Sequence, residues 1–353
     1  MLRSKGGWSI IILFLLSALV LGSSYISPEA FWPSSFFVLA LIPVLILNLL
    51  VLFFLLFKRS VSLVFPLLIL VAGLRFLPKF YAWPTDDAQQ VSKSDFRVVS
   101  YNTSFFRVGG AFTPGYYSAD KNLLALQIND WIRTNGADII CLQEFFDDKN
   151  SDIFNNVQTI GEQGGYRYHF LNRPQHDNGI GRGLIVFSKF PIVHHGDILL
   201  SDNRYNGAMF VDLEINQDTV RVINLHLESL SLSERAKNKT LLWVIKNNAV
   251  QKCQQARAVI DEVRSSPYPT IVCGDFNEVP NGFIYRQFDQ QLKNAFEEKG
   301  QGGGLTYQGS YPIPLLRIDN QFYDPAFQLV SFATHYSIGY SDHFPIEARY
   351  RIP

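Results

Sequence analysis

Hydrophobic and polar positions divide the chain into two regions of different character. Over the first eighty residues, apolar residues run almost without interruption in three segments, at 8–23, 36–57 and 61–78. The middle segment holds 22 residues, of which only Asn48 is polar. At about 1.5 Å per residue, a helix of that length crosses the hydrocarbon core of a bilayer. We therefore predict that residues 1–81 form a membrane anchor of about three transmembrane helices.

The charges between these segments predict the orientation of the anchor. Arg3 and Lys5 precede the first segment. Lys58 and Arg59 separate the second from the third, whereas residues 24–35 carry no basic residue. By the positive-inside rule, three spans place the rest of the chain on the extracytoplasmic side of an inner or plasma membrane. Two alternatives stay open: the first segment is a cleaved signal peptide, or the third lies in the interface and leaves the following domain cytoplasmic.

After a polar linker at 82–94 the pattern changes to short β-branched or aromatic runs that alternate with helical apolar spacing. Helical spacing covers 120–134 and 233–265. Residues 300–314 are rich in glycine, which predicts a loop beside any site. Because strands outnumber helices and several are neighbours in sequence, we expect packed mixed sheets with helices outside them. The strand-like runs are 96–102, 137–143, 183–190, 208–215, 219–227, 269–276 and 344–352.

The charge is unevenly distributed, although the chain contains 31 basic and 31 acidic residues. Six of the basic residues and one acidic residue precede residue 81, which leaves 25 basic against 30 acidic residues for the remainder. An acidic domain is a poor match for long nucleic acid held by its backbone charge, which weakens a nuclease interpretation without removing it. The three cysteines (Cys141, Cys253 and Cys273) do not make a disulfide framework.

Polar side chains that suit a metal or a phosphate follow the ends of the apolar runs. Each has an ordinary alternative as a turn residue, a helix start, a half-buried histidine or a cap. The ordered set beside successive strands is far more specific than any member. Its members are Asn102, Gln143, Glu144, His226, Asp275, Asn277, Asp342 and His343, with Asp319 placed 24 residues before His343.

Together with the segment GRGLIVFSKFPIV, this set resembles the endonuclease/exonuclease/phosphatase superfamily, which includes deoxyribonucleases and sphingomyelinases. The resemblance covers about residues 95–353 and implies an α+β fold, a four-layer α/β/β/α sandwich of two mixed sheets with the site at one end. Thr103 stands where the family usually has a hydrophobic residue. Asn320 and Gln321 depart from the family pattern after Asp319.

The resemblance implies a metal site and an acid–base group. Glu144 and Asn102 match the family's metal ligands, and Asp342 would add a second carboxylate, directly or through water. Mg²⁺ prefers such oxygen ligands and neutralises charge on a phosphodiester, and Mn²⁺ would substitute for it. His343 matches the histidine that activates water, and Asp319 matches the carboxylate that fixes its tautomer.

The remaining candidates face the phosphate. Asp275 and Asn277 match family residues that orient the water and hold the phosphate. His226 matches a second histidine of the deoxyribonuclease and sphingomyelinase branches, which hydrogen-bonds the phosphate or aids the leaving oxygen. Asn206 and Arg182 are candidate substrate-binding residues, with a turn asparagine and a solvated loop arginine as their alternatives.

The sequence thus predicts a membrane-anchored, metal-dependent phosphohydrolase that cleaves phosphodiester bonds. Its partners would be the lipid bilayer and a phosphodiester or phosphomonoester, whether nucleic acid, phospholipid or inositol phosphate, and we infer no protein partner. The alternative is a catalytically silent family member that acts as a membrane-tethered scaffold, but Glu144, Asp275 and His343 are all retained. A transporter is disfavoured because Asn48 is a lone polar residue within the spans.

Overall fold

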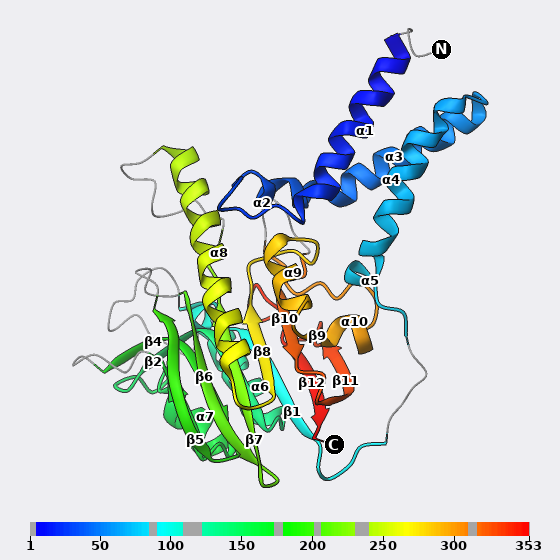
Figure 1. Ribbon diagram of the computed structural model, residues 1–353. Helices are drawn as coiled ribbons and strands as arrows, with labels where there is room; N and C mark the ends of the chain where they lie inside the picture. The colour runs from blue at the N-terminus through cyan, green and yellow to red at the C-terminus, as the bar shows by residue number, and fades with distance from the viewer. Residues whose placement is uncertain are drawn as a thin grey trace.

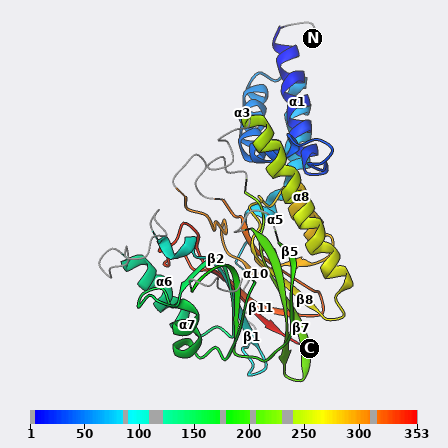
Figure 2. The ribbon, with the colours of Figure 1, turned by 90° about the vertical axis from the view of Figure 1, so that its left-hand side faces the viewer.

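Two six-stranded sheets pack face to face in the computed structural model of the chain, with helices on both outer faces (Figures 1 and 2). Parallel pairing occurs between β1 and β2 and between β7 and β8, so both sheets are mixed. The first sheet has the order β11 (Gln328–Thr334), β12 (Ile346–Arg351), β1 (Phe96–Asn102), β2 (Ile139–Asp148), β4 (Ile180–Ser188) and β3 (Tyr168–Leu171). The second has the order β5 (Ile192–Leu200), β6 (Gly207–Ile215), β7 (Asp218–His226), β8 (Thr270–Asp275), β10 (Asp319–Tyr323) and β9 (Lys293–Asn294). The structure describes residues 5–84, 90–108, 122–172, 179–200, 206–229, 240–309 and 316–352.

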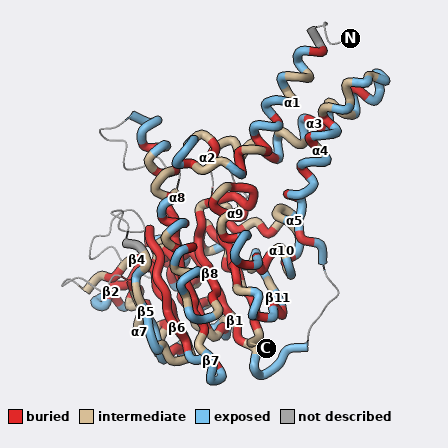
Figure 3. The backbone as a smooth tube through the Cα atoms, viewed as in Figure 1, coloured by how far each residue is buried: buried red, intermediate tan, exposed pale blue. Residues whose placement is uncertain are grey.

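The central strands are buried on both faces, as Figure 3 shows. Side chains alternate across a strand, so Val98 packs between the two sheets while Val99 packs under the outer helices of the first sheet. The helices α6 (Leu123–Thr134) and α7 (Asn156–Gly164) cover that sheet. On the other side, α8 (Leu241–Ser265) and α9 (Phe283–Asp289) cover the second sheet. The predicted four-layer α/β/β/α sandwich is confirmed. The remaining helical turns of the sandwich are η4 (Ser104–Arg107) and α10 (Ala295–Lys299).

The sequence pattern does not predict β3, β5, β9, β10 or β11. In β10 the first three residues are polar yet buried, because hydrogen bonds replace apolar contacts. Gln321 donates from Nε2 to the carbonyl oxygens of Val98 and Ile346 in the facing sheet, at 3.0 and 3.2 Å. Buried polar groups satisfied in this way carry no hydrophobic signal.

Three apolar helical stretches precede the sandwich. Two of them, Ser34–Phe57 and Val61–Phe80, are long and apolar enough to cross a membrane, whereas the apolar part of α1, Gly7–Ser23, is shorter. Asn48 is buried, and its Nδ2 donates to Ser17 Oγ at 2.8 Å. The elements are α1 (Lys5–Ser23), α2 (Ser34–Phe37), η1 (Val38–Ala40), α3 (Leu41–Phe57), η2 (Val61–Leu63), α4 (Val64–Gly73), η3 (Leu74–Phe76) and α5 (Leu77–Phe80).

The predicted linker is attached to the sandwich at its start. Ala82 exchanges two backbone hydrogen bonds with Gly302, at 3.0 and 2.9 Å. Immediately after the linker, Asp95 pairs with Arg351 at 2.6 Å. Residues 85–89 lie outside the described residues, as do residues 233–239 of the predicted long helix and residues 310–314 of the predicted loop.

Candidate functional site

The polar strand ends meet at one end of the sandwich because parallel strands finish at the same edge of a sheet. His226 ends β7 and lies opposite Asp275, which ends β8. Asp319 begins the antiparallel β10 and also lies opposite Asp275. Two carboxylates directly opposite each other on neighbouring strands repel, so this pair lowers the stability of the sheet.

Glu144 is directed into the site by an irregularity in β2. The pairing of β2 with β4 shifts between Leu142 and Phe145, and Glu144 has φ 48° in the left-handed region, which is unusual for a residue with a side chain. Thr103 holds this bulge, since its hydroxyl donates to the carbonyl oxygens of Gln143 and Glu144 at 3.2 and 2.9 Å. Thr103, which stands where the family usually has a hydrophobic residue, therefore stabilises the backbone conformation of Glu144.

Asn102 connects the two sheets at the site. Its Nδ2 donates to Asp275 Oδ2 at 3.1 Å and lies 3.4 Å from Glu144 Oε1, while its Oδ1 accepts from the backbone N–H of Ser104 at 3.0 Å. In this orientation the amide presents its NH₂ group to the carboxylates. A metal bound to Oδ1 would require the amide to turn and give up the Ser104 bond.

His343 is oriented by Asp319. Their Nδ1 and Oδ2 atoms are 2.8 Å apart, which assigns the proton to Nδ1 and directs Nε2 toward Asp275 Oδ2, at 3.7 Å. Burial by itself lowers the pKa of His343, but the negative charges of Asp319 and Asp275 outweigh it and raise the pKa to about 10. Thr306 Oγ1 accepts from the backbone N–H of Asp319 at 3.0 Å, which fixes the start of β10.

His226 lies between the carboxylates of the two sheets. Its Nε2 is 3.6 Å from Asp275 Oδ2 and 3.8 Å from Glu144 Oε1. Its Nδ1 is buried and has no hydrogen-bond partner among the described residues. Burial raises the pKa of both Glu144 and Asp275. Carboxylates gathered in this way are stabilised by a positive charge between them.

Two carboxylate groupings are available to a cation. The ligand atoms of Asp275, Asp319 and His343 lie within 4.8 Å of one another. In that group the His343 nitrogen facing Asp319 is already hydrogen-bonded. The other carboxylates are Glu144, whose Oε1 lies 3.8 Å from His226 Nε2, and Asp342, whose Oδ1 accepts from Ser341 Oγ at 3.1 Å.

The loop after β8 is tied to α8. Asn277 has φ 47°, and its backbone N–H donates to Asp275 Oδ1 at 2.8 Å. Lys252, fully buried on α8, donates to the carbonyl oxygen of Asn277 at 2.8 Å and to Glu278 Oε2 at 2.5 Å. Asn277 Nδ2 in turn donates to the carbonyl oxygen of Leu227 at 3.0 Å.

The two candidate substrate-binding residues make structural contacts. Asn206 donates from Nδ2 to the same Leu227 carbonyl oxygen at 2.7 Å, so it joins Asn277 in holding the segment after β7. Arg182, on β4, places its guanidinium 5.5 Å from the centre of the Phe146 ring. The predicted role of both residues in substrate binding therefore stays a prediction.

Three residues that bear on the site were not predicted from the sequence: Lys252, Thr306 and Tyr307. The Tyr307 ring lies edge-on to His343, with centroids 5.0 Å apart. It belongs to the segment 300–314 that was predicted as a loop beside the site. Lys252 interrupts the apolar stripe of α8, and that interruption was the available signal.

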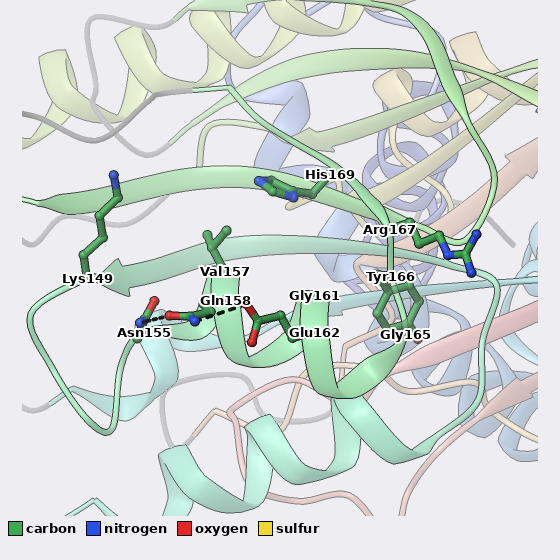
Figure 4. A pocket seen from close by; sticks show the side chains of 10 residues that line it. All are labelled: Lys149, Asn155, Val157, Gln158, Gly161, Glu162, Gly165, Tyr166, Arg167 and His169. Atoms are coloured by element: carbon green, nitrogen blue, oxygen red, sulfur yellow. Dashed lines mark hydrogen bonds between the residues drawn. The ribbon is translucent and has the colours of Figure 1, made fainter.

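A separate surface groove of about 860 Å³ lies between α7 and β3 (Figure 4). None of the candidate site residues lines it. Asn155 donates to Gln158 and Gln158 donates to Glu162, at 2.7 and 3.1 Å, so the polar groups of α7 pair along the exposed helix face. We assign the groove no role in the site.

Comparison with known proteins identifies the family of the chain. Residues 99–343 match the endonuclease/exonuclease/phosphatase family, and residues 7–80 match a domain of unknown function. No curated protein sequence matches the chain.

Solved structures share the fold. An endonuclease/exonuclease/phosphatase from Beutenbergia cavernae is 19% identical, with 73% of this chain and 72% of that chain covered and a TM-score of 0.50. The human Nocturnin catalytic domain with bound sulfate is 20% identical, with 74% and 96% covered and a TM-score of 0.50. An endonuclease/exonuclease/phosphatase from Bacteroides vulgatus is 16% identical, with 74% and 100% covered and a TM-score of 0.51. On the extent of the family match, the chain belongs to the endonuclease/exonuclease/phosphatase family.

Proposed function

We propose that this phosphodiesterase- or phosphatase-type hydrolase is a divalent-metal-dependent enzyme, anchored in a membrane, that cleaves phosphodiester bonds with a water activated by His343. The observation that carries the proposal is the contact of His343 with Asp319 at 2.8 Å, which leaves Nε2 directed at the acidic centre of the site. This is the geometry of a positioned acid–base histidine.

The residues present fit a divalent cation. Glu144 and Asp342 would hold it through carboxylate oxygens, with Asn102 joining if its amide turns. Burial raises the pKa of Glu144, and the buried Nδ1 of His226 has no hydrogen-bond partner among the described residues. The side chains of the site therefore do not satisfy one another's charges and hydrogen bonds. When bound, Mg²⁺ or Mn²⁺ would neutralise phosphate charge and bring the pKa of His343 down toward neutrality, where the imidazole accepts a proton.

The other residues of the site then have defined tasks. Asp319 accepts from Nδ1–H of His343 and stabilises its charged form. Asp275 orients the water between itself and Nε2 of His343. His226 donates from Nε2 to a phosphate oxygen or to the leaving oxygen, and Asn277 shapes the loop that holds Asp275.

Membrane anchoring is supported by the exterior of the N-terminal helices. Large apolar side chains that face outward would remain in water in a soluble protein, at a cost for each one. The buried hydrogen bond between Ser17 and Asn48 is the kind of contact that joins helices in a bilayer. Outward-facing side chains that are more than half exposed include Ile12, Leu15, Leu50, Phe53, Phe57, Val61 and Leu74.

The test uses the full chain purified in detergent, with bis(p-nitrophenyl) phosphate as a soluble phosphodiester. We expect hydrolysis that requires Mg²⁺ or Mn²⁺ and stops on chelation. Glu144→Gln should move the midpoint of the metal titration upward by about tenfold or more, because a charged ligand becomes neutral. Hydrolysis that persists in excess chelator, or an unchanged midpoint in the Glu144 variant, would contradict the metal assignment.

A further inference from the structure

The N-terminal helices attach to the sandwich beside the catalytic loops. Asn281, four residues after Asn277, is buried and donates from Nδ2 to the carbonyl oxygen of Val38 at 2.7 Å. Arg317, two residues before Asp319, donates from Nη2 to the carbonyl oxygen of Lys79 at 2.6 Å. The ends of the helices that face the sandwich therefore border the candidate site.

Charged and aromatic contacts set the angle of this attachment. Lys79 pairs with Asp289 at 2.7 Å and with Glu297 at 3.3 Å. Farther along the same edge, the Arg286 guanidinium lies 4.1 Å from the centre of the Tyr25 ring. Several contacts spread over one edge restrict rotation better than a single hinge would.

The opposite ends of the helices lie away from the sandwich. The N-terminus and the turn between α3 and α4 are at the far end of the helical region, and α2 and α5 are at the near end (Figure 1). Lys5 and Lys58 are therefore distant from the sandwich, as the charge pattern of the sequence predicts. If the helices cross a bilayer, the bilayer surface that faces the sandwich lies next to the end where β1 and β8 finish.

A second element reaches the same level. The 25 residues of α8 span roughly 37 Å, so the helix extends well beyond the sheet that it covers. In both views its first turn lies at the level of the N-terminal helices, and in Figure 1 it stands to the left of α2, apart from α1, α3 and α4 (Figures 1 and 2). That turn begins with Leu241, Leu242 and Trp243, which are 53%, 64% and 43% exposed. Farther along α8, Cys253 Sγ lies 3.7 Å from Ser27 Oγ and Arg257 pairs with Glu29.

Three large apolar residues in succession at a helix start are unfavourable in water. Thr240 accepts from the backbone N–H of Trp243 at 3.4 Å, so the turn is a capped helix start that presents these side chains outward. Leucine beside tryptophan is the composition of segments that enter the headgroup region of a bilayer. Near the middle of α8, Lys252 donates to the carbonyl oxygen of Asn277, which connects the helix to the loop after β8.

We propose that Leu241, Leu242 and Trp243 insert into the bilayer that holds the N-terminal helices, and that the site hydrolyses a phosphoester in the headgroup of a membrane lipid. This inference rests on the proposed function and specifies its substrate class. The sandwich is held at two places, the helical anchor and the tip of α8, with the candidate site at the same end. A substrate in the bilayer surface reaches such a site without leaving the membrane.

The reaction balances as a hydrolysis. The oxygen of one water bonds to phosphorus while one of its protons passes to Nε2 of His343. The ester P–O bond breaks, and the leaving oxygen takes up one proton. The lipid alcohol and the phosphorylated fragment together contain the substrate plus one water.

The test compares two substrates with the same purified protein, a lipid in reconstituted vesicles and a soluble phosphodiester in detergent. The full chain is reconstituted with Mg²⁺ into vesicles of equimolar phosphatidylcholine and phosphatidylglycerol, and lipid products are measured by mass spectrometry. Leu241→Ser/Leu242→Ser should lower the rate on vesicle lipid by about tenfold, because lost insertion of two leucines weakens membrane contact. Its rate on bis(p-nitrophenyl) phosphate in detergent should be unchanged, which also establishes that the variant is folded.

The matched control removes exposed apolar side chains at the other end of the sandwich. Val193→Ser and Tyr268→Ser, on β5 and after α8, should leave both rates unchanged. An equal loss on both substrates in the leucine variant, or no loss on either, would overturn the membrane contact. Cleavage of plasmid DNA or RNA with vesicle lipids left intact would overturn the lipid substrate while retaining the proposed function. A wild-type chain inactive on every phosphodiester would refute the proposed function itself.

Discussion

At the scale of single residues, the site consists of acidic groups that are costly to bring together. Asp275 faces Asp319 across a strand pair and also lies near both histidines. The sheet gains nothing from this arrangement, since an apolar pair would stabilise the same register. The proposed cation would offset this repulsion, as the charged form of His343 already does in part.

The Asp319 contact provides the sharpest test at this scale. Asp319→Asn replaces a carboxylate by a neutral amide whose NH₂ can donate to Nδ1, so His343 loses its Nδ1–H tautomer and the support for its positive charge. We expect kcat on bis(p-nitrophenyl) phosphate to fall by about two to four orders of magnitude at saturating metal. KM and the thermal unfolding temperature should change little. Full activity in this variant would remove His343 from the mechanism.

Some of the site was predictable from the sequence, and the reason is geometric. Asn102, His226 and Asp275 each follow an apolar run, and parallel strands bring such ends to one edge. The contacts of Tyr307 and Lys252 were not predictable: the glycine-rich segment indicates a loop but not which of its residues meets His343, and a lysine in an apolar helix stripe does not reveal its partner. Only the packed structure shows what each of them touches.

At the scale of elements, α8 connects the second sheet to the loop that carries Asn277. Lys252 and Glu278 form a buried ion pair, and each would leave an uncompensated charge if its partner were removed. Lys252→Met should therefore lower the free energy of unfolding by about 3 to 5 kcal/mol in urea titrations. The double variant Lys252→Met/Glu278→Leu should recover most of that loss. Additive losses in the double variant would contradict the pairing.

The strand pair β1–β12 carries a pH-dependent contribution. Burial raises the pKa of Glu347, but the contact with His335 Nε2 at 3.3 Å and the hydrogen bonds from Arg97 outweigh it and lower the pKa from 4.5 to about 2. A lowered carboxyl pKa stabilises the fold above the unfolded value and loses that contribution as the pH falls through the folded value. The window is therefore about pH 5 to about pH 2, and the contribution is about 3 kcal/mol.

The measurement for this contribution is the difference in unfolding free energy between wild type and Glu347→Gln. Arg97 donates to Glu347 Oε2 at 2.7 Å, so the amide variant loses an ion pair but keeps the strand. The difference should be constant near neutral pH and shrink toward zero in the acid window. A difference that is independent of pH throughout would refute the assigned pKa.

At the scale of the whole molecule, sequence patterns do not predict how the N-terminal helices are attached to the sandwich. Hydropathy predicts the three apolar segments, and strand runs predict the sandwich. How they join depends on contacts such as Asn281 with Val38 and Arg317 with Lys79. These are single polar side chains in segments that carry no periodic signal, so their partners emerge only from the folded chain.

The topology follows from combining that attachment with the charge pattern. Lys5, Lys58 and Arg59 lie at the ends of the helices away from the sandwich, so, if the helices span a membrane, we expect from the positive-inside rule that the sandwich is on the extracytoplasmic side. Alkaline phosphatase fused after residue 353 should be active, because its disulfides form only outside the reducing cytoplasm, while a green fluorescent protein at the same position should not fluoresce. The opposite pattern in well-expressed fusions would place the sandwich in the cytoplasm. The Arg317 and Asn281 contacts would then hold the candidate site against the inner leaflet, where the positive-inside rule does not place it.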